Sequence, residues 1–200
     1  MNEVCFLSGW AGTAELFPGL DGRARFIVPF LDGDEGFCLE AARDSGATVL
    51  AGWSTGGHMI LKHAAWLLPR FAKVVLVAPF ARFTDSFPAR LVRSMIARME
   101  RDPEGTSRDF WQACGFTDPA AFRPEWALPL TEGLRYLLAS EAKDVSVAAR
   151  HVTVLHGDAD RIVRTPAVDA AVAGLAGARR ITYAGGHLPA EAVLAQSLEE

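Results

Sequence analysis

Short apolar runs alternate with amphipathic stretches along most of the chain. The run at 74–77 is apolar at every position, as in a strand that is buried on both faces of a sheet. Strands that alternate with helices predict βαβ units around a parallel sheet. We expect strands at residues 4–7, 25–29, 48–52, 73–78, 152–156 and 180–183, and helices at 36–45, 56–68, 166–175 and 189–198.

Residues 82–150 interrupt this alternation. They contain helical patterns separated by prolines, with no strand pattern over about 70 residues. An excursion of this length between two strands is typical of a lid over a site, although an ordinary helical insertion with a small core of its own would have the same pattern. We therefore predict a core formed by 1–81 and 151–200, and a helical lid insertion at 82–150, called the lid region below.

The composition is that of a globular protein, with 50% hydrophobic and 22% charged residues among 200. A net charge of −4 supplies no basic surface for nucleic acid. The three cysteines are widely spaced and form no CxxC pair, which indicates neither a disulfide framework nor a zinc site. With no signal-peptide or membrane-span pattern, we expect a cytoplasmic monomer that binds no metal, cofactor, nucleic acid or membrane.

The sharpest motif is Gly52-Trp53-Ser54-Thr55-Gly56, where a predicted strand meets a predicted helix. A G-x-S-x-G sequence in this context holds the serine in a strained turn and projects its hydroxyl above the sheet. The helix N-terminus and the Thr55 amide would then stabilise negative charge on an oxyanion. A glycine-rich strand-to-helix turn without catalytic function could have the same sequence. The prediction of a nucleophile therefore depends on finding its catalytic partners.

A serine nucleophile requires a histidine that takes its proton and a carboxylate that orients this histidine. The last predicted strand is followed by a glycine pair and His187, the predicted base. The strand before it ends in an acidic loop with Asp158 and Asp160, of which one would orient the base and the other could cap the turn. We expect structural roles for the remaining histidines: His58, His63, His151 and His156.

A second oxyanion donor is expected in the loop after the first strand, residues 8–12. The backbone amide of Trp10 suits this role, and its indole is expected to line the pocket. A packing role for Trp10 is the alternative.

Together these motifs resemble those of the α/β-hydrolases. The acid loop of that family commonly reads H-G-x-x-D-x-x-V, which residues 156–163 match, and the resemblance therefore implies Asp160 as the acid. Many members begin with an extra antiparallel hairpin, whereas this chain starts at the oxyanion strand. The resemblance implies a mostly parallel sheet of about six strands flanked by helices, with a helical lid.

Within that superfamily the sequence is most similar to the pimeloyl-acyl-carrier-protein methyl ester esterases of biotin synthesis. The similarity lies in Gly9-Trp10, the Ser54 motif and the lid stretch 90–115 with Phe110 and Trp111. Ser8, where a histidine is common, and Arg164, where a proline is common, depart from the pattern. The resemblance implies a serine carboxylesterase acting on this methyl ester, with Phe110 and Trp111 at the substrate and acyl-carrier protein as the partner.

The lid region also holds an arginine pattern. At 100° per residue, a helix from residue 90 places four arginines on one face and Leu91, Val92, Met95, Ile96 and Met99 on the other. Such a helix would bind an acidic carrier protein while its apolar side covers the acyl chain, although a solvated arginine face would show the same pattern. The four are Arg90, Arg93, Arg98 and Arg101.

Two other functions fit the same residues. A general short-chain carboxylesterase or thioesterase would use the same triad without a carrier protein. A noncatalytic ligand-binding protein of the hydrolase fold would use only the pocket, and the presence of serine, aspartate and histidine argues against it.

Overall fold

A computed structural model describes residues 3–116 and 121–199 of the chain. Its main sheet has six strands in the order β2-β1-β3-β4-β6-β8, and every neighbouring pair is parallel. The predicted α/β fold with a parallel sheet is confirmed. The strands are β1 (Val4–Leu7), β2 (Ala24–Ile27), β3 (Val49–Trp53), β4 (Lys73–Val77), β6 (Val152–Gly157) and β8 (Arg179–Tyr183).

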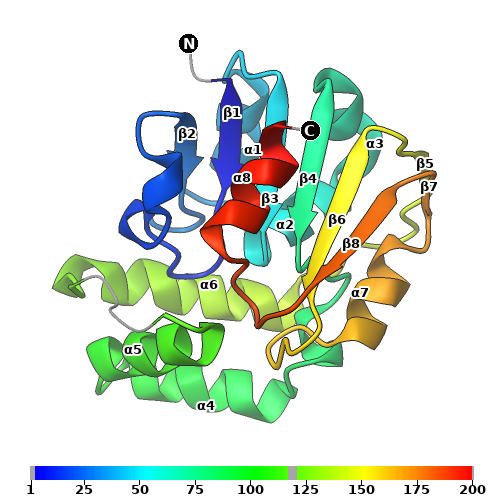
Figure 1. Ribbon diagram of the computed structural model, residues 1–200. Helices are drawn as coiled ribbons and strands as arrows, with labels where there is room; N and C mark the ends of the chain where they lie inside the picture. The colour runs from blue at the N-terminus through cyan, green and yellow to red at the C-terminus, as the bar shows by residue number, and fades with distance from the viewer. Residues whose placement is uncertain (1–2, 117–120, 200) are drawn as a thin grey trace.

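Helices cover both faces of this sheet (Figure 1). Helix α8 (Glu191–Glu199) lies in front of the strands in this view, and α1 (Glu35–Arg43) and α2 (Thr55–Lys62) lie behind them. The predicted helix at 56–68 is divided, because His63 leaves helical geometry at φ −112° and ψ 20°. It continues as the short α3 (Ala64–Leu67) and a 3-10 turn at Leu68–Arg70. Helix α7 (Thr165–Val172) connects β6 to β8.

The described part of the lid region, 82–116 and 121–150, contains three helices that lie across the carboxyl ends of the strands (Figure 1). They are α4 (Ala89–Met99), α5 (Pro103–Cys114) and α6 (Ala127–Ala139), with 3-10 turns at Phe83–Asp85 and Pro124–Trp126. A pair of two-residue strands, β5 (Val147–Ala148) and β7 (Leu175–Ala176), was not predicted, because two residues are too short for an alternating pattern. No helix within 3–116 and 121–199 is long and apolar enough to cross a membrane.

The predicted arginine helix is shorter than expected. Helix α4 ends at Met99, and α5 begins at Pro103, capped by the Asp102 side chain, which accepts a hydrogen bond from the Gly105 amide at 2.9 Å. Arg101 therefore lies in the connection between two helices and does not share the face of Arg90 and Arg93.

Candidate active site

The strand order reverses direction at β1. The chain after β1 runs to β2 on one side, whereas the chain after β3 runs to β4 on the other side. The two connections therefore leave the carboxyl edge of the sheet in opposite directions. Open parallel sheets place their ligands at such a switch point. Here residues 8–12, called the oxyanion loop below, follow β1, and Ser54 follows β3.

The turn at Ser54 has the strained backbone expected of the motif. Its φ of 53° and ψ of −109° lie in a region that non-glycine residues rarely adopt. A Cβ atom at Gly56 would come within 2.0 Å of the Leu7 carbonyl oxygen, and one at Gly52 within 2.8 Å of the Gly56 carbonyl carbon. The two glycines of the motif are therefore required by the close approach of helix α2 to strands β1 and β3.

The structure brings Ser54, His187 and Asp160 together in one hydrogen-bonded chain. The Ser54 hydroxyl lies 2.9 Å from Nε2 of His187, and Nδ1 of His187 lies 2.8 Å from Oδ2 of Asp160. Because an ionised carboxylate only accepts hydrogen bonds, His187 carries its proton on Nδ1, and its Nε2 accepts the bond from Ser54. This is the arrangement that activates a serine nucleophile.

Asp160 has further donors that fix its second oxygen. Its Oδ1 accepts the amides of Ile162 at 2.8 Å and Val163 at 3.0 Å. Burial by itself would raise the pKa of Asp160, but the hydrogen bond and charge of His187, together with these amides, hold that pKa below its ordinary value. Asp160 is thus kept ionised beside His187. Asp158 is exposed and accepts the Gly185 amide at 3.0 Å, so it caps the turn.

The backbone of His187 is held by the residue that precedes the nucleophile. The indole Nε1 of Trp53 donates to the His187 carbonyl oxygen at 2.9 Å. A Cβ at Gly157 would lie 2.2 Å from the Gly186 carbonyl oxygen, so the acid and base loops pack backbone against backbone. Sequence reasoning missed this role of Trp53, because a tryptophan between a glycine and a serine has no distinguishing pattern.

The oxyanion loop is tightly closed on itself. The Ser8 hydroxyl donates to the Gly12 carbonyl oxygen at 2.5 Å, and the Gly12 amide donates to Gly9 at 3.0 Å. Ser8 stands where the family commonly has a histidine. It is fully buried, and its hydrogen bond links the two ends of this loop. The Trp10 amide points to the start of α2 and donates to Oγ1 of Thr55 at 3.2 Å. The Trp10 amide is therefore held at the side chain of the residue that follows Ser54.

The aromatic residues of the lid region pack onto the oxyanion loop. Phe110 meets the Trp10 ring edge-on with centroids 4.9 Å apart, and the Trp111 indole donates to the Ala11 carbonyl oxygen at 2.7 Å. The Trp10 indole is 1% exposed and donates to the Leu130 carbonyl oxygen in α6 at 2.7 Å. The indole N–H groups of Trp10 and Trp111 thus join the oxyanion loop to the lid region.

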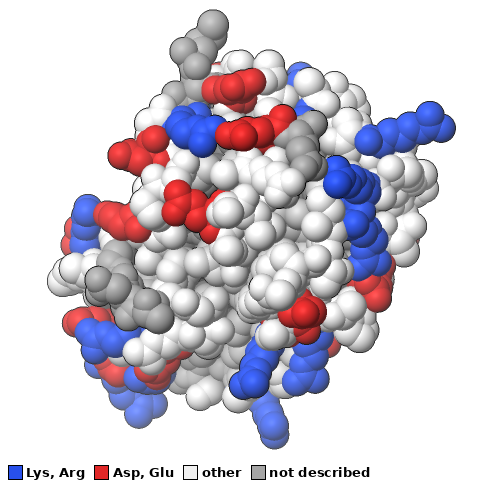
Figure 2. Space-filling model, in the orientation of Figure 1, with Lys and Arg blue, Asp and Glu red and all other residues white. Residues whose placement is uncertain are grey.

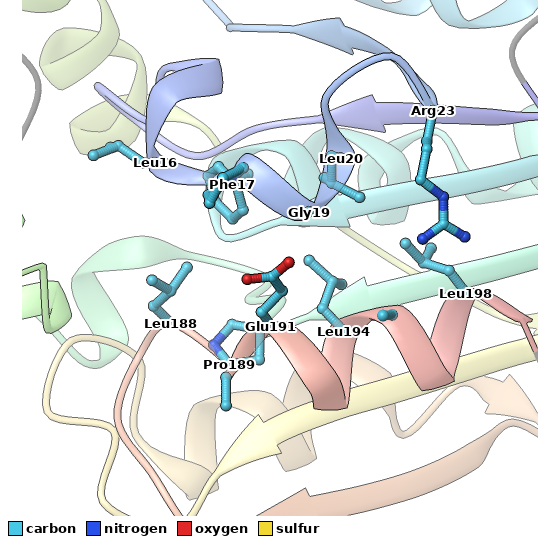
Figure 3. A pocket seen from close by; sticks show the side chains of 13 residues that line it. Leu16, Phe17, Gly19, Leu20, Arg23, Leu188, Pro189, Glu191, Leu194 and Leu198 are labelled. Atoms are coloured by element: carbon cyan, nitrogen blue, oxygen red, sulfur yellow. The ribbon is translucent and has the colours of Figure 1, made fainter.

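The site is closed to solvent. Ser54 is 3% exposed and His187 is 1% exposed. A groove lies between α8 and the 3-10 turns Ala14–Leu16 and Pro18–Leu20, with a volume of about 220 Å³ (Figure 3). It reaches the base loop at Leu188, the residue after His187. Apolar side chains line most of it, including Leu16, Phe17, Leu20, Leu188, Leu194 and Leu198.

A second groove of about 230 Å³ lies between α4 and α5. Leu91 was predicted on the covered apolar face of α4, but it is 43% exposed and lines this groove. Phe110 and Ile162 also line the groove, and these two residues contact the oxyanion loop and the acid respectively. Each groove is thus lined by a residue close to a triad member along the chain, Leu188 in the first and Ile162 in the second, and no triad residue lines either.

The predicted arginine face is only partly present. Arg90 and Arg93 are exposed on α4 and form no ion pair within the described part of the chain. Arg98 binds Asp102 at 2.9 Å and also contacts Asp109, which neutralises its charge. Figure 2 shows basic side chains at the lower edge of the molecule, where α4 lies. The unneutralised charge on this helix comes from two arginines.

The other histidines have structural contacts, as predicted. His58 is fully buried between the Phe80 carbonyl oxygen and the Ser140 hydroxyl, each at 2.9 Å, and burial lowers its pKa to about 4. His156 and His151 contact the carbonyl oxygens of Val163 and Leu68, and His63 contacts Glu35.

Within residues 3–116 and 121–199, no group of three metal-ligating side chains is close enough to hold a metal ion.

Comparison with known proteins decides the family. Residues 8–196 match the Alpha/beta hydrolase family, a span that includes the oxyanion loop, Ser54, Asp160 and His187. The chain belongs to the alpha/beta hydrolase family. In members of this family a triad in this chain order serves hydrolysis through a serine nucleophile, and the geometry above is that of a serine hydrolase. None of the curated proteins with which the chain was compared matched it significantly.

Solved structures share the fold at low sequence identity. An esterase from Exiguobacterium antarcticum superposes with a TM-score of 0.68 at 18% identity, over 94% of this chain and 85% of that one. BioG from Haemophilus influenzae gives 0.62 at 14% identity, over 93% and 89%. The type II thioesterase BorB from the borrelidin biosynthetic cluster gives 0.60 at 15% identity, over 98% and 91%. At these identities the likeness is one of fold.

Proposed function

We propose that this protein is a serine carboxylesterase and that its substrate is the methyl ester of pimeloyl-acyl-carrier protein. The observation that carries the reaction class is the buried chain Ser54–His187–Asp160, with hydrogen bonds of 2.9 and 2.8 Å. The substrate is supported by the resemblance to the esterases of biotin synthesis and by the exposed Arg90 and Arg93 on α4.

The reaction follows from the geometry. As Ser54 Oγ attacks the ester carbonyl carbon, its proton passes to Nε2 of His187, and Asp160 stabilises the imidazolium. The Thr55 amide, and the Trp10 amide once it has left Oγ1 of Thr55, stabilise the negative charge on the carbonyl oxygen. Collapse of this intermediate breaks the bond to the methoxy oxygen, and His187 gives it the proton, so methanol leaves. Water, deprotonated by His187, then hydrolyses the acyl-enzyme to the free carboxylate and restores Ser54.

The direct test is hydrolysis of methyl pimeloyl-acyl-carrier protein by the purified enzyme, with methanol and the free acid as measured products. We expect turnover of this ester with a kcat/KM at least tenfold above that for methyl pimelate without the carrier. Equal rates on both esters would contradict the carrier protein as partner, while leaving the reaction class intact. Failure to hydrolyse any ester would contradict the carboxylesterase itself.

Charge reversal on α4 is expected to weaken carrier binding. Arg90→Glu with Arg93→Glu replaces two exposed cations that would face an acidic partner, so KM for the carrier-bound ester should rise about tenfold at low salt. The kcat, and the hydrolysis of free short-chain esters, should stay within twofold. Arg43→Glu, an exposed arginine on α1, is the matched control. An unchanged KM in the α4 variant would exclude this docking face.

A general short-chain esterase or thioesterase is the second candidate. It is favoured by one observation: Arg98 is neutralised by its aspartates and Arg101 lies outside α4, so the basic face has half the predicted arginines. Such an enzyme would hydrolyse p-nitrophenyl butyrate or an acyl thioester at the same rate with or without the α4 charge reversal.

The groove of Figure 3 is expected to hold the apolar chain of the substrate, because it reaches Leu188 beside the base. Ala195→Trp would fill it from α8 and should lower kcat/KM for octanoyl esters about tenfold, with acetyl esters nearly unaffected. Ser94→Trp, which would fill the groove between α4 and α5, is the control. Loss of octanoyl activity in the Ser94 variant alone would place the chain between α4 and α5.

A further inference from the structure

We propose that Trp111 is a positioning residue for the oxyanion hole, which acts through Ala11 to hold the Trp10 amide. This inference rests on the proposed serine hydrolase function. It assigns to Trp111 a role that differs from substrate contact: helix α5 of the lid region would complete the geometry of the oxyanion loop.

The contact that carries the inference is short and buried. Nε1 of Trp111 donates to the Ala11 carbonyl oxygen at 2.7 Å, while the Thr13 amide reaches the same oxygen at 3.2 Å. Trp111 is 1% exposed and Ala11 is fully buried. A buried hydrogen bond of this kind is costly to leave unmade, so the indole fixes the position of this carbonyl.

The backbone at Ala11 needs such support. Its φ of 56° lies in the left-handed region, where an L-alanine is strained, and strained residues persist only where their surroundings hold them. Ala11 directly follows Trp10, whose amide faces Thr55 and the nucleophile turn. A rotation that relieves the strain at Ala11 would also turn the neighbouring peptide groups of the loop and move this amide from its place at Oγ1 of Thr55, beside the nucleophile turn.

A second hydrogen bond to the lid region holds the side chain of Trp10. Its indole donates to the Leu130 carbonyl oxygen of α6 at 2.7 Å, and the Phe110 ring packs edge-on against it. Helix α6 therefore holds Trp10 from 120 residues away along the chain, and helix α5 holds Ala11 from 100 residues away. Oxyanion donors contribute most when they are fixed before the reaction, which gives this support a catalytic consequence.

The test compares Trp111→Phe with the wild type on a short-chain ester. The phenyl ring retains much of the apolar contact and removes the donor, so kcat should fall about 10- to 100-fold while KM changes less than threefold. The affinity for a trifluoromethyl ketone, which forms an oxyanion on Ser54, should fall by the same factor as kcat/KM. Trp126→Phe, another tryptophan of the lid region, is the control and should keep wild-type values.

A rescue separates positioning from general packing. Because glycine adopts a positive φ without strain, Ala11→Gly added to Trp111→Phe should restore kcat to within about threefold of the wild type. If Trp111→Phe does not fold, ¹⁵N-tryptophan spectra of the wild type provide the test: the Trp111 indole signal should shift when the ketone binds, and that of Trp126 should not.

The outcomes distinguish the two proposals. An active wild type with an unchanged kcat in Trp111→Phe, or with no shift of the Trp111 signal, would overturn the positioning role alone. A wild type that hydrolyses no ester would overturn the proposed function and this role with it.

Discussion

Ser54→Ala is expected to lower ester hydrolysis by about 10⁴- to 10⁶-fold and to abolish labelling by a fluorophosphonate probe. The substitution removes the only atom that forms the acyl bond in the proposed mechanism, while the oxyanion donors and the pocket remain. The residual rate should therefore reflect binding and oxyanion stabilisation alone. Single-turnover measurements on the carrier-bound methyl ester and on p-nitrophenyl butyrate would check the expected loss.

The matched control is Ser146→Ala, an exposed serine directly before β5, which should retain full activity and labelling. Circular dichroism and the unfolding temperature would show that both variants are folded. Undiminished turnover in Ser54→Ala would exclude the mechanism. Lost turnover with labelling retained would assign the label to another nucleophile.

Asp160→Asn is expected to lower kcat about 10⁴-fold at neutral pH. An asparagine at this position presents an amide or a carbonyl to Nδ1 of His187 and no longer fixes the proton there, so Nε2 is not reliably free to accept from Ser54. KM should change little, because the side chain is buried behind the base. Asp158→Asn, which alters only the exposed turn cap, should stay within threefold. The reverse ranking would assign the acid to Asp158.

The same variant should change the pH dependence of stability. The pKa of Asp160 is lower in the folded protein than in the unfolded chain, where it is about 3.9. Its stabilising effect is thus fully present above the unfolded pKa, and is lost as the pH falls through the lower folded pKa. Urea unfolding between pH 6 and 2 should show a smaller loss of stability in Asp160→Asn than in the wild type, after allowance for its lower starting value.

The fold and the triad could be predicted because their signals are local. Strand β4 is apolar from Val74 to Val77, and each triad residue lies within four residues of the end of a strand, so the shared edge of a parallel sheet brings them together. The acid was the exception: Asp158 and Asp160 are equally placed after β6, and the family pattern was needed to choose between them. In the structure the two amides at Ile162 and Val163 make the difference.

Tertiary contacts explain what could not be predicted. Periodicity shows which face of a helix is apolar, but not which loop it covers, so the bonds from Trp10 to α6 and from Trp111 to Ala11 have no sequence signal. The error at Arg101 was of another kind. Asp102-Pro103 is a helix start in which the aspartate caps and the proline occupies the first turn, and continuing α4 through residue 101 overlooked it.

The order of strands has a consequence for synthesis. The ribosome releases the chain from its N-terminus, so β1, β3 and β4 emerge first, with the oxyanion loop and the nucleophile turn. The acid and the base follow β6 and β8, which form the opposite side of the sheet and are translated after the lid region. A nascent chain would therefore carry its nucleophile without a proton acceptor until β8 and the loop with His187 have been translated, and the serine would gain its reactivity only then.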